Sequence, residues 1–422
     1  METSKSPRQG LRDDPRTQLW WCNLLHIFND GYLASLALLL PFVAADLGLN
    51  YTQSGLIKTA SSVAISASQI PAGLLAERVG EILILGLGTA WFSLSYVAML
   101  LVAGYPLLLL VAFAAGTGGG AYHPVGTALI ANVFPPSRSA AAIGALNSFG
   151  DVGKVVFPAL TGMLVVAVGW RWSFAAQGAV GLGVALCYLL FFRREIGATR
   201  RQIAQRRKGG VADPQVGPKT LRGWMVGWGI CAPRQFTLYA IIGLLDVAVR
   251  TAATVFLGFV LIGSGVEKGA LGWLLSLTFL GGGCGKLRCG MLIRWWSSRS
   301  IILFTEALMI LGCFAMPSVP AGWMLLLFLP IFGFVLNGTS SVIYIGLAPT
   351  IARQQRSRGY ALYYTLNFFS SALAPYIFGL VGDAFGLDII FFSAGMVMAL
   401  GLPLVFFLRD IEDLPSTGEV DG

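Results

Sequence analysis

Residues 172–210 read WSFAAQGAVGLGVALCYLLFFRREIGATRRQIAQRRKGG, and this stretch decides the class of the fold. Its first 21 residues carry no charge, and an α-helix of that length spans the hydrocarbon core of a bilayer. The 18 residues that follow hold seven Lys or Arg residues, which is typical of a cytoplasmic loop beside a membrane helix. The stretch therefore predicts a transmembrane helix that ends in a basic cytoplasmic segment.

The same pattern of apolar blocks runs along the whole chain of 422 residues. Apolar residues make up 56% of the chain, charged residues 12%, and the mean hydropathy is +0.73. That composition excludes a water-soluble enzyme and predicts an all-α polytopic membrane protein, because lipid offers backbone groups no hydrogen-bond partner outside helices. Gly, Pro and charged residues separate these apolar blocks and mark the ends of the helices. They predict twelve transmembrane helices at about 19–43, 52–75, 82–103, 107–131, 139–167, 172–192, 236–262, 269–293, 300–317, 322–347, 358–382 and 388–408.

The positions of the basic residues predict the orientation of the chain. With a cytoplasmic N-terminus, inner loops and flanks hold 22 of the 29 Lys and Arg residues, two lie outside and five lie within spans. We therefore expect both termini to be cytoplasmic. The predicted parts are a tail at 1–18, a six-helix bundle at 19–192, a basic linker at 193–234, a second six-helix bundle at 235–408 and a tail at 409–422.

The two halves of the chain also resemble each other in sequence. A shift of 220 residues superimposes the following pairs: Arg138 and Arg358, Leu146 and Leu366, Asn147 and Asn367, Phe149 and Phe369, Gly162 and Gly382. Arg and Asn are rare in apolar segments, so the apolar composition of the two halves does not by itself explain these matches. The repeat predicts two bundles related by pseudo-two-fold symmetry, which is a known plan among transporters.

Cysteine and histidine usage argues against a metal site or a membrane enzyme. The six cysteines form no CxxC pair, and the two histidines cannot build a zinc site of standard spacing. The chain also lacks a Gly-x-Ser-x-Gly elbow, an HExxH motif and a Walker A sequence. We expect no enzymatic activity, no cofactor, no resident metal and no nucleic-acid partner.

Ionisable side chains near the centres of the predicted spans are the best functional candidates, because each costs about 2.5 to 3.5 kcal/mol to insert into a bilayer. On the first helix His26, Asn29 and Asp30 are spaced i, i+3, i+4 and share a face. Such a carboxylate suits a group that takes up and releases a proton. The alternative is that these residues hold the first helix to a neighbour through hydrogen bonds. For His123 in the fourth helix, the alternative to a functional role is a buried histidine whose hydrogen bonds are made within the protein core.

Two pairs of opposite charge lie at the same depth in the membrane. Asp151 and Lys154 are one turn apart, as are Asp246 and Arg250, so each pair can neutralise itself. Arg250 is also a candidate for substrate contact, because a guanidinium can hold a carboxylate or phosphonate through two hydrogen bonds. Glu306, toward the inner third of its helix, is placed where its side chain can snorkel to the interface.

The segment Gly73-Leu-Leu-Ala-Glu77-Arg78-Val-Gly80, between the second and third helices, resembles the Gly-x-Leu-Ala-Asp-Arg-x-Gly turn of the major facilitator superfamily. That resemblance covers nearly all of the chain and implies the superfamily fold. It also implies that Gly73, Glu77, Arg78 and Gly80 form a gating latch. Glu77 replaces the usual Asp, and Glu81 stands where the family carries a basic residue.

Three further segments resemble the fosmidomycin-resistance branch of that superfamily. They are Leu25-His26-Ile-Phe-Asn29-Asp30, Gly116-Thr-Gly-Gly-Gly-Ala-Tyr-His123-Pro124, and Gly150-Asp151-Val-Gly153 with Phe157-Pro158. The family pattern after His-Pro continues with charged residues, whereas this chain reads Val125-Gly126-Thr127. The depth of the ionisable residues in their spans, together with these motifs, predicts a proton-coupling or substrate cavity that includes His26, Asn29, Asp30, His123, Asp151, Lys154, Asp246 and Arg250.

These observations predict a secondary active transporter that moves a small solute by alternating access. Export of a small anionic or drug-like compound by proton antiport is the first choice, and uptake of a metabolite or of a metal ion such as iron is the alternative. A non-transporting scaffold or receptor built on a transporter fold is a lesser alternative. The expected partners are the solute, protons and the lipid bilayer, in a bacterial inner membrane or one derived from it, with the chain functional as a monomer.

Overall fold

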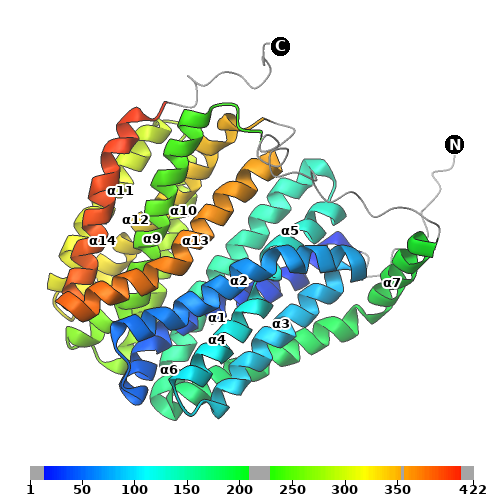
Figure 1. Cartoon of the computed structure of the whole chain (residues 1–422), viewed down its shortest axis with the longest axis horizontal. Coiled ribbons are helices and arrows are strands. Elements are labelled where there is room, and N and C mark those ends of the chain that lie inside the picture. Colours follow the sequence, from blue (N-terminus) through cyan, green and yellow to red (C-terminus); the bar gives the residue numbers. More distant parts are fainter. Residues whose placement is uncertain (1–13, 209–228, 353–355, 410–422) are drawn as a thin grey trace. The chain divides into compact units, whose positions relative to one another are not determined.

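The computed structural model describes residues 14–208, 229–352 and 356–409, and almost all of these residues are helical. The one β contact among them is an isolated bridge between Ile230 and Ile351. The helices are α1 (Pro15–Leu47), α2 (Tyr51–Val79), α3 (Glu81–Val97), α4 (Tyr105–Gly119), α5 (Tyr122–Val133), α6 (Pro136–Phe191), α7 (Arg193–Lys208), α9 (Pro233–Gly263), α10 (Leu271–Leu292), α11 (Ser298–Ala315), α12 (Trp323–Leu347), α13 (Arg356–Phe385) and α14 (Leu387–Gly401) (Figure 1).

These helices account for the twelve predicted spans. Ten helical segments of the described chain are long and apolar enough to cross a bilayer. One of them, Ala141–Phe191, contains two spans, because Gly169 interrupts α6 with a φ of 78°. The twelfth is α2, which is 29 residues long but richer in Ser, Thr and Gln than the others. The prediction of an all-helical protein with twelve spans is confirmed.

The fourth predicted span, at 107–131, is not one continuous helix. It is divided into α4 and α5, and the break lies at Gly120 and Ala121, directly before His123 and Pro124. Pro124 has no N–H group, so the carbonyl one turn earlier is left free and the chain bends there. Three consecutive glycines add to that effect, since glycine gains little from staying helical.

The described helices group into two compact units. One comprises Met1–Ser35, Ala64–Phe157 and Val168–Pro214, and the other comprises Leu36–Val63, Pro158–Ala167 and Gln215–Gly422. Residues of α1, α2 and α6 therefore belong to both units. The two bundles predicted from the sequence follow the order of the chain instead. They lie at 19–192 and 235–408, with a linker at 193–234, and this division stays a prediction.

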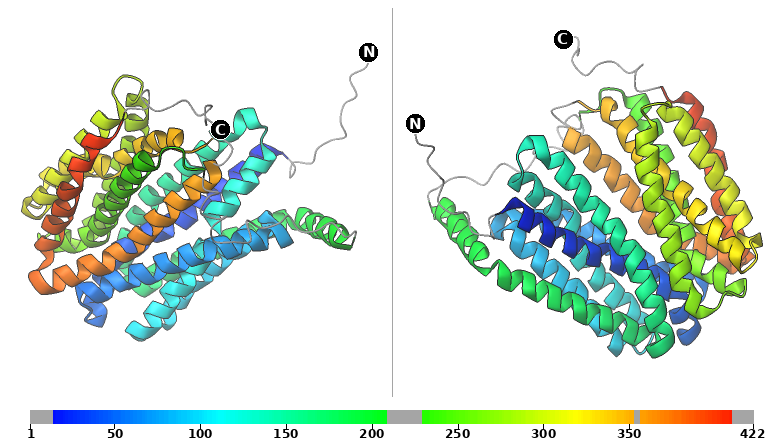
Figure 2. Two further views of the ribbon diagram at one scale, coloured as in Figure 1. Left: turned by 45° about the horizontal axis from the view of Figure 1, so that its top comes forward. Right: turned by 180° about the vertical axis from the view of Figure 1, so that it is seen from behind.

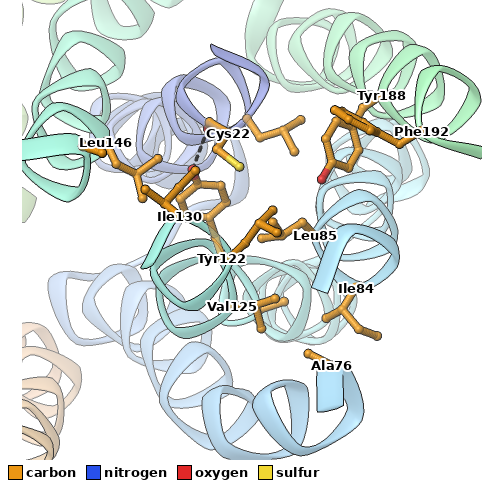
Figure 3. Close-up of a cluster of buried hydrophobic side chains, with 14 residues drawn as sticks. Cys22, Ala76, Ile84, Leu85, Tyr122, Val125, Ile130, Leu146, Tyr188 and Phe192 are labelled. Atoms are coloured by element: carbon orange, nitrogen blue, oxygen red, sulfur yellow. Dashed lines mark hydrogen bonds between the residues drawn. The ribbon is translucent and has the colours of Figure 1, made fainter. Parts of the chain in front are cut away.

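The first unit has a buried core between α1, α3, α5, α6 and the end of α2. Figure 3 shows Tyr122 at its centre, where the phenol donates a hydrogen bond of 2.5 Å to the backbone oxygen of Cys22. Leu85, Val125 and Ile130 pack around it, each at most 1% exposed. This core holds α5 against α1 and so fixes the position of His123 relative to Asp30. Figure 2 shows α7 following on directly from α6.

Glycines set the closest helix contacts in the second unit. α10 packs along α12, α13 and α14 pack along α9, and α11 contacts both α12 and α14. A Cβ at Gly281 would overlap the backbone oxygen of Pro330, and one at Gly333 would overlap that of Thr278. Gly281 and Gly282 therefore serve close helix packing, whereas Gly283 faces open space.

Candidate proton and anion sites

Six of the predicted site residues lie together in the first unit, around the carboxylate of Asp30. They are His26, Asn29 and Asp30 on α1, His123 on α5, and Asp151 and Lys154 on α6. Asp30 is only 4% exposed, and four of the other five side chains contact it directly. The sequence predicted the shared face of α1, and the structure adds that α5 and α6 bring their charged groups to that same face.

The contact between His26 and Asp30 has the geometry of a pair that can share a proton. Nδ1 of His26 lies 2.7 Å from the backbone oxygen of Leu146, and because that oxygen can only accept, Nδ1 is the donor. Nε2 then faces Oδ1 of Asp30 at 3.4 Å, where a bare lone pair would oppose a carboxylate oxygen. A proton on either of these two atoms turns the contact into an attraction. The geometry therefore suits a residue pair that binds and releases a proton.

Lys154 joins the two acids of the cluster. Its ammonium lies 3.0 Å from Oδ2 of Asp30 and 3.0 Å from Oδ1 of Asp151. The sequence predicted the pair with Asp151, which is confirmed, but it did not predict the pair with Asp30. Oδ1 of Asp30 also accepts a hydrogen bond of 3.1 Å from Asn29 and lies 3.7 Å from Nε2 of His123.

Two glycines on α6 allow this cluster to form. A Cβ at Gly150 would lie 2.7 Å from Nε2 of His26 and 2.8 Å from Oδ2 of Asp30, so any side chain there would displace both groups. A Cβ at Gly153 would overlap the backbone oxygen of Ile27. The Gly-x-x-Gly spacing, already visible in the sequence, thus lets α6 approach α1 closely enough for Lys154 to reach Asp30.

The three groups that could serve as metal ligands in this cluster are better suited to a proton. His26, Asp30 and His123 present ligand atoms within 4.8 Å of one another. However, the second oxygen of Asp30 is paired with the ammonium of Lys154, which would repel a divalent cation bound to the first. His26 and Asp30, in contrast, need a proton to make their contact favourable.

Asp246 and Arg250 form the predicted pair on α9, in the second unit. The guanidinium lies 3.5 Å from Oδ2 of Asp246, one turn earlier on the helix. Asp246 is 1% exposed, whereas the Arg250 side chain keeps 20% of its surface open. Tyr344 and Tyr363, with ring centroids 5.5 Å apart, lie within electrostatic range of Arg250. A partly exposed guanidinium can bind a small carboxylate through two hydrogen bonds.

The expectation that Glu306 snorkels to the interface is wrong. Its side chain is fully buried, with 0% exposure, because α11 turns this face toward its neighbours rather than toward lipid. The signal in the sequence was the lack of any charged residue within four positions of Glu306, which left no partner on its own helix.

The predicted latch residues lie at the junction of α2 and α3. α2 ends at Val79, Gly80 turns the chain with a φ of 99°, and α3 begins at Glu81. Glu77 and Arg78 are exposed, and Gly73 lies within α2 with open space around it. Helix α7, at the start of the predicted linker, covers the turn, with the methyl group of Thr199 3.0 Å from a Cβ built at Gly80. Their role as a latch stays a prediction.

Comparisons with known proteins agree with this architecture. The family described as Major Facilitator Superfamily matches residues 19–352 and, in a second match, 239–421. A hexuronate transporter of Bacillus subtilis strain 168 is 29% identical over 41% of this chain and 42% of that protein. A probable L-galactonate transporter of Escherichia coli strain K12 is 26% identical over 87% of this chain and 83% of that protein.

A solved structure has the same fold. It is the bacterial homologue of the human lysosomal transporter Spinster, in an inward-facing and unoccupied conformation. The TM-score is 0.73 at 16% sequence identity, with coverage of 95% of this chain and 96% of that one. The predicted fold, twelve membrane helices in the arrangement of that superfamily, is confirmed.

Proposed function

Because the chain belongs to the major facilitator superfamily and is therefore a multi-pass membrane transporter rather than an enzyme, we propose that it carries a small organic anion together with protons. The observation that carries this proposal is the cluster at Asp30, where one proton is needed between His26 and Asp30. The related transporters named for hexuronate and L-galactonate support an anionic substrate.

The charges of the site favour movement of anion and proton in the same direction. An incoming anion competes with Asp30 for the ammonium of Lys154, or with Asp246 for the guanidinium of Arg250. The displaced carboxylate then lies in a poorly solvated place without its cation, and a proton removes that cost. Anion and proton thus bind together, which is proton symport, and the two halves of the protein alternate access to the site.

Export of a drug-like compound in exchange for protons is the second candidate function. The fosmidomycin-resistance-like motifs around Asn29, His123 and Gly150 support it, and membership of that branch stays a prediction. In this scheme a proton and the compound bind the Asp30 cluster in turn rather than together. A phosphonate is the matching probe, since its charge suits Lys154 and Arg250.

Proteoliposome flux decides between these functions. Purified protein would be given labelled hexuronate, L-galactonate or fosmidomycin under an imposed pH gradient. Symport predicts uptake into vesicles that are more alkaline inside, and loss of this accumulation in Asp30→Asn; Glu267→Gln, at an exposed acid, is the matched control. Accumulation driven by the opposite gradient would establish antiport. Flux of iron alone would establish uptake of a metal ion. Absence of flux with every probe would favour a non-transporting scaffold or receptor.

We further propose that both termini are cytoplasmic, in a bacterial inner membrane, and that a single chain is functional. The distribution of 22 of 29 basic residues on one side supports the orientation. Both charged clusters are made by one chain, which supports function as a monomer. Cysteine labelling at loop positions from each side of sealed vesicles would test the orientation.

A further inference from the structure

Glu306 on α11 is a buried acid that the proposed transport scheme does not use. Its side chain is 0% exposed, and neither carboxylate oxygen has a hydrogen-bond partner within the described part of the chain. A carboxylate placed like this, without donors, is one of the most costly groups that a protein interior can hold. Its protonation state therefore needs an explanation.

The hydroxyl groups beside Glu306 have already used their protons. Thr305 donates to the backbone oxygen of Ile301 at 2.8 Å, and Thr339 donates to the hydroxyl of Thr305 at 2.8 Å. Thr339 has thus given its hydroxyl proton to Thr305, and it makes no hydrogen bond to the carboxyl group of Glu306. No hydroxyl proton is left to stabilise an ionised carboxylate here, whereas a protonated carboxyl group carries no charge and costs less to bury.

The charges in this region lead to the same conclusion. Asp246 and Arg250 on α9 are the charged groups that act on Glu306. The thiol of Cys313 is also within electrostatic range of Glu306, and Tyr363 is in range of Asp246. Two carboxylates and one guanidinium would leave a net charge of −1 inside the bilayer, and Arg250 already pairs with Asp246. One bound proton makes the cluster neutral.

We propose that Glu306 and Asp246 form a second proton-binding site, in which Glu306 carries the proton. The site is separate from the Asp30 cluster, since all of its groups belong to the second unit. As a bound ligand a proton needs only one acceptor, whereas a metal cation would need several oxygen ligands. That this proton takes part in transport, as a second coupling ion, rests on the proposed function.

Infrared difference spectroscopy tests the protonation of Glu306 directly. The spectrum of Glu306→Gln is subtracted from that of the unmodified protein at pH 7.5. The proposal predicts loss of the C=O stretching band of a protonated carboxylic acid, shifted in D₂O. Loss of the carboxylate stretching bands instead would overturn it. Glu267→Gln removes an exposed acid and serves as the control that shows the carboxylate signature.

Thr339→Val gives a second, independent readout that does not depend on the stability of Glu306→Gln. Valine keeps the shape of threonine but removes its hydroxyl group. Because Glu306 receives no hydrogen bond from Thr339, we expect the C=O band of the protonated acid to persist in Thr339→Val. Replacement of that band by carboxylate bands would contradict the proposal.

The pH dependence of stability offers a thermodynamic test. Gln is a neutral isostere of a protonated Glu, so the two proteins should unfold alike at pH 7.5. As the pH rises far enough to remove the proton, the unmodified protein should become less stable than Glu306→Gln. A constant difference at every pH, or stabilisation of the unmodified protein by Na⁺, would overturn the proton site.

Transport stoichiometry tests the coupling role. Proton influx, measured with a trapped pH dye, is divided by anion influx in proteoliposomes. We expect this ratio to fall by one in Glu306→Gln while anion flux persists, and an unchanged ratio would remove Glu306 from coupling. If the unmodified protein shows no proton-coupled flux, the proposed function fails, but the infrared result still decides whether Glu306 holds a proton.

Discussion

The ammonium of Lys154 is the charge whose removal should cost the structure most. It lies 3.0 Å from one oxygen of Asp30 and 3.0 Å from one of Asp151, so Lys154→Met leaves two acids without a cation. At that distance the attraction is roughly 5 to 6 kcal/mol per contact for an effective dielectric constant of 20, before solvation is counted. Removing one partner of a buried pair costs about 3 to 5 kcal/mol, and the 31% exposure of the Lys154 side chain favours the lower end, about 3 kcal/mol.

A double-mutant cycle isolates this interaction from the loss of side-chain packing. We expect Asp30→Asn combined with Lys154→Met to be more stable than the sum of the single costs predicts, by about 2 kcal/mol, because the double variant no longer leaves Asp30 charged without its cation; Asp151 loses its cation in both variants that lack Lys154. Unfolding titrations in mixed micelles measure the four free energies, and Lys268→Met, at an exposed lysine, is the control. Costs that simply add would refute the pairing on which the site is built.

Three further perturbations follow from particular contacts. The carboxylate of Asp383 caps the start of α2 by accepting hydrogen bonds from the backbone N–H groups of Tyr51 at 2.8 Å and Thr52 at 3.0 Å. Asp383→Ala should therefore lower the free energy of unfolding by about 1 kcal/mol in the same micelle assay, and Asp383→Asn by less. Equal losses would argue against this cap. Gly333→Ala should cost about 1 to 3 kcal/mol because the new Cβ meets the backbone of Thr278, whereas Gly283→Ala faces open space and should change little; similar values for the two would contradict the close packing. Arg250→Lys should raise the KM for the anion roughly 10-fold or more, since a charged hydrogen bond contributes about 1.5 to 3 kcal/mol. An unchanged KM in flux assays would exclude substrate contact, and Arg288→Lys, at an exposed arginine, is the control.

The fold was largely predictable because the bilayer imposes a length on each helix. Apolar blocks of about 20 residues, ended by Gly, Pro or charge, mark most span boundaries to within a few residues, and Gly169 divides α6 where the sequence predicts. The sequence predicts one span at 107–131, whereas the structure divides it into α4 and α5. Helix continuity there depends on how neighbouring helices support the chain at Gly120 and Ala121, and that information is not local to the sequence.

The candidate site was predictable only along each helix. Periodicity places His26, Asn29 and Asp30 on one face, and pairs Asp151 with Lys154 and Asp246 with Arg250, because all of these lie within one turn of each other. Contacts between helices depend on which face each helix turns inward. The pair of Asp30 with Lys154 and the burial of Glu306 are both of this kind, and the second was predicted wrongly for that reason.

The two units arrive at the same balance of charge with different residues. In the first, Asp30 and Asp151 face one ammonium, Lys154, and the proposed proton beside His26 makes the set neutral. In the second, Asp246 pairs with the one guanidinium, Arg250, while Glu306 is buried in the same unit, and the proposed proton on Glu306 makes this set neutral. An anion that binds either cation adds a charge of −1, which the low-dielectric surroundings penalise unless another proton binds with it. Neutrality of the loaded site is thus one physical reason for the proposed symport of anion and proton, and it applies to each of the two units separately.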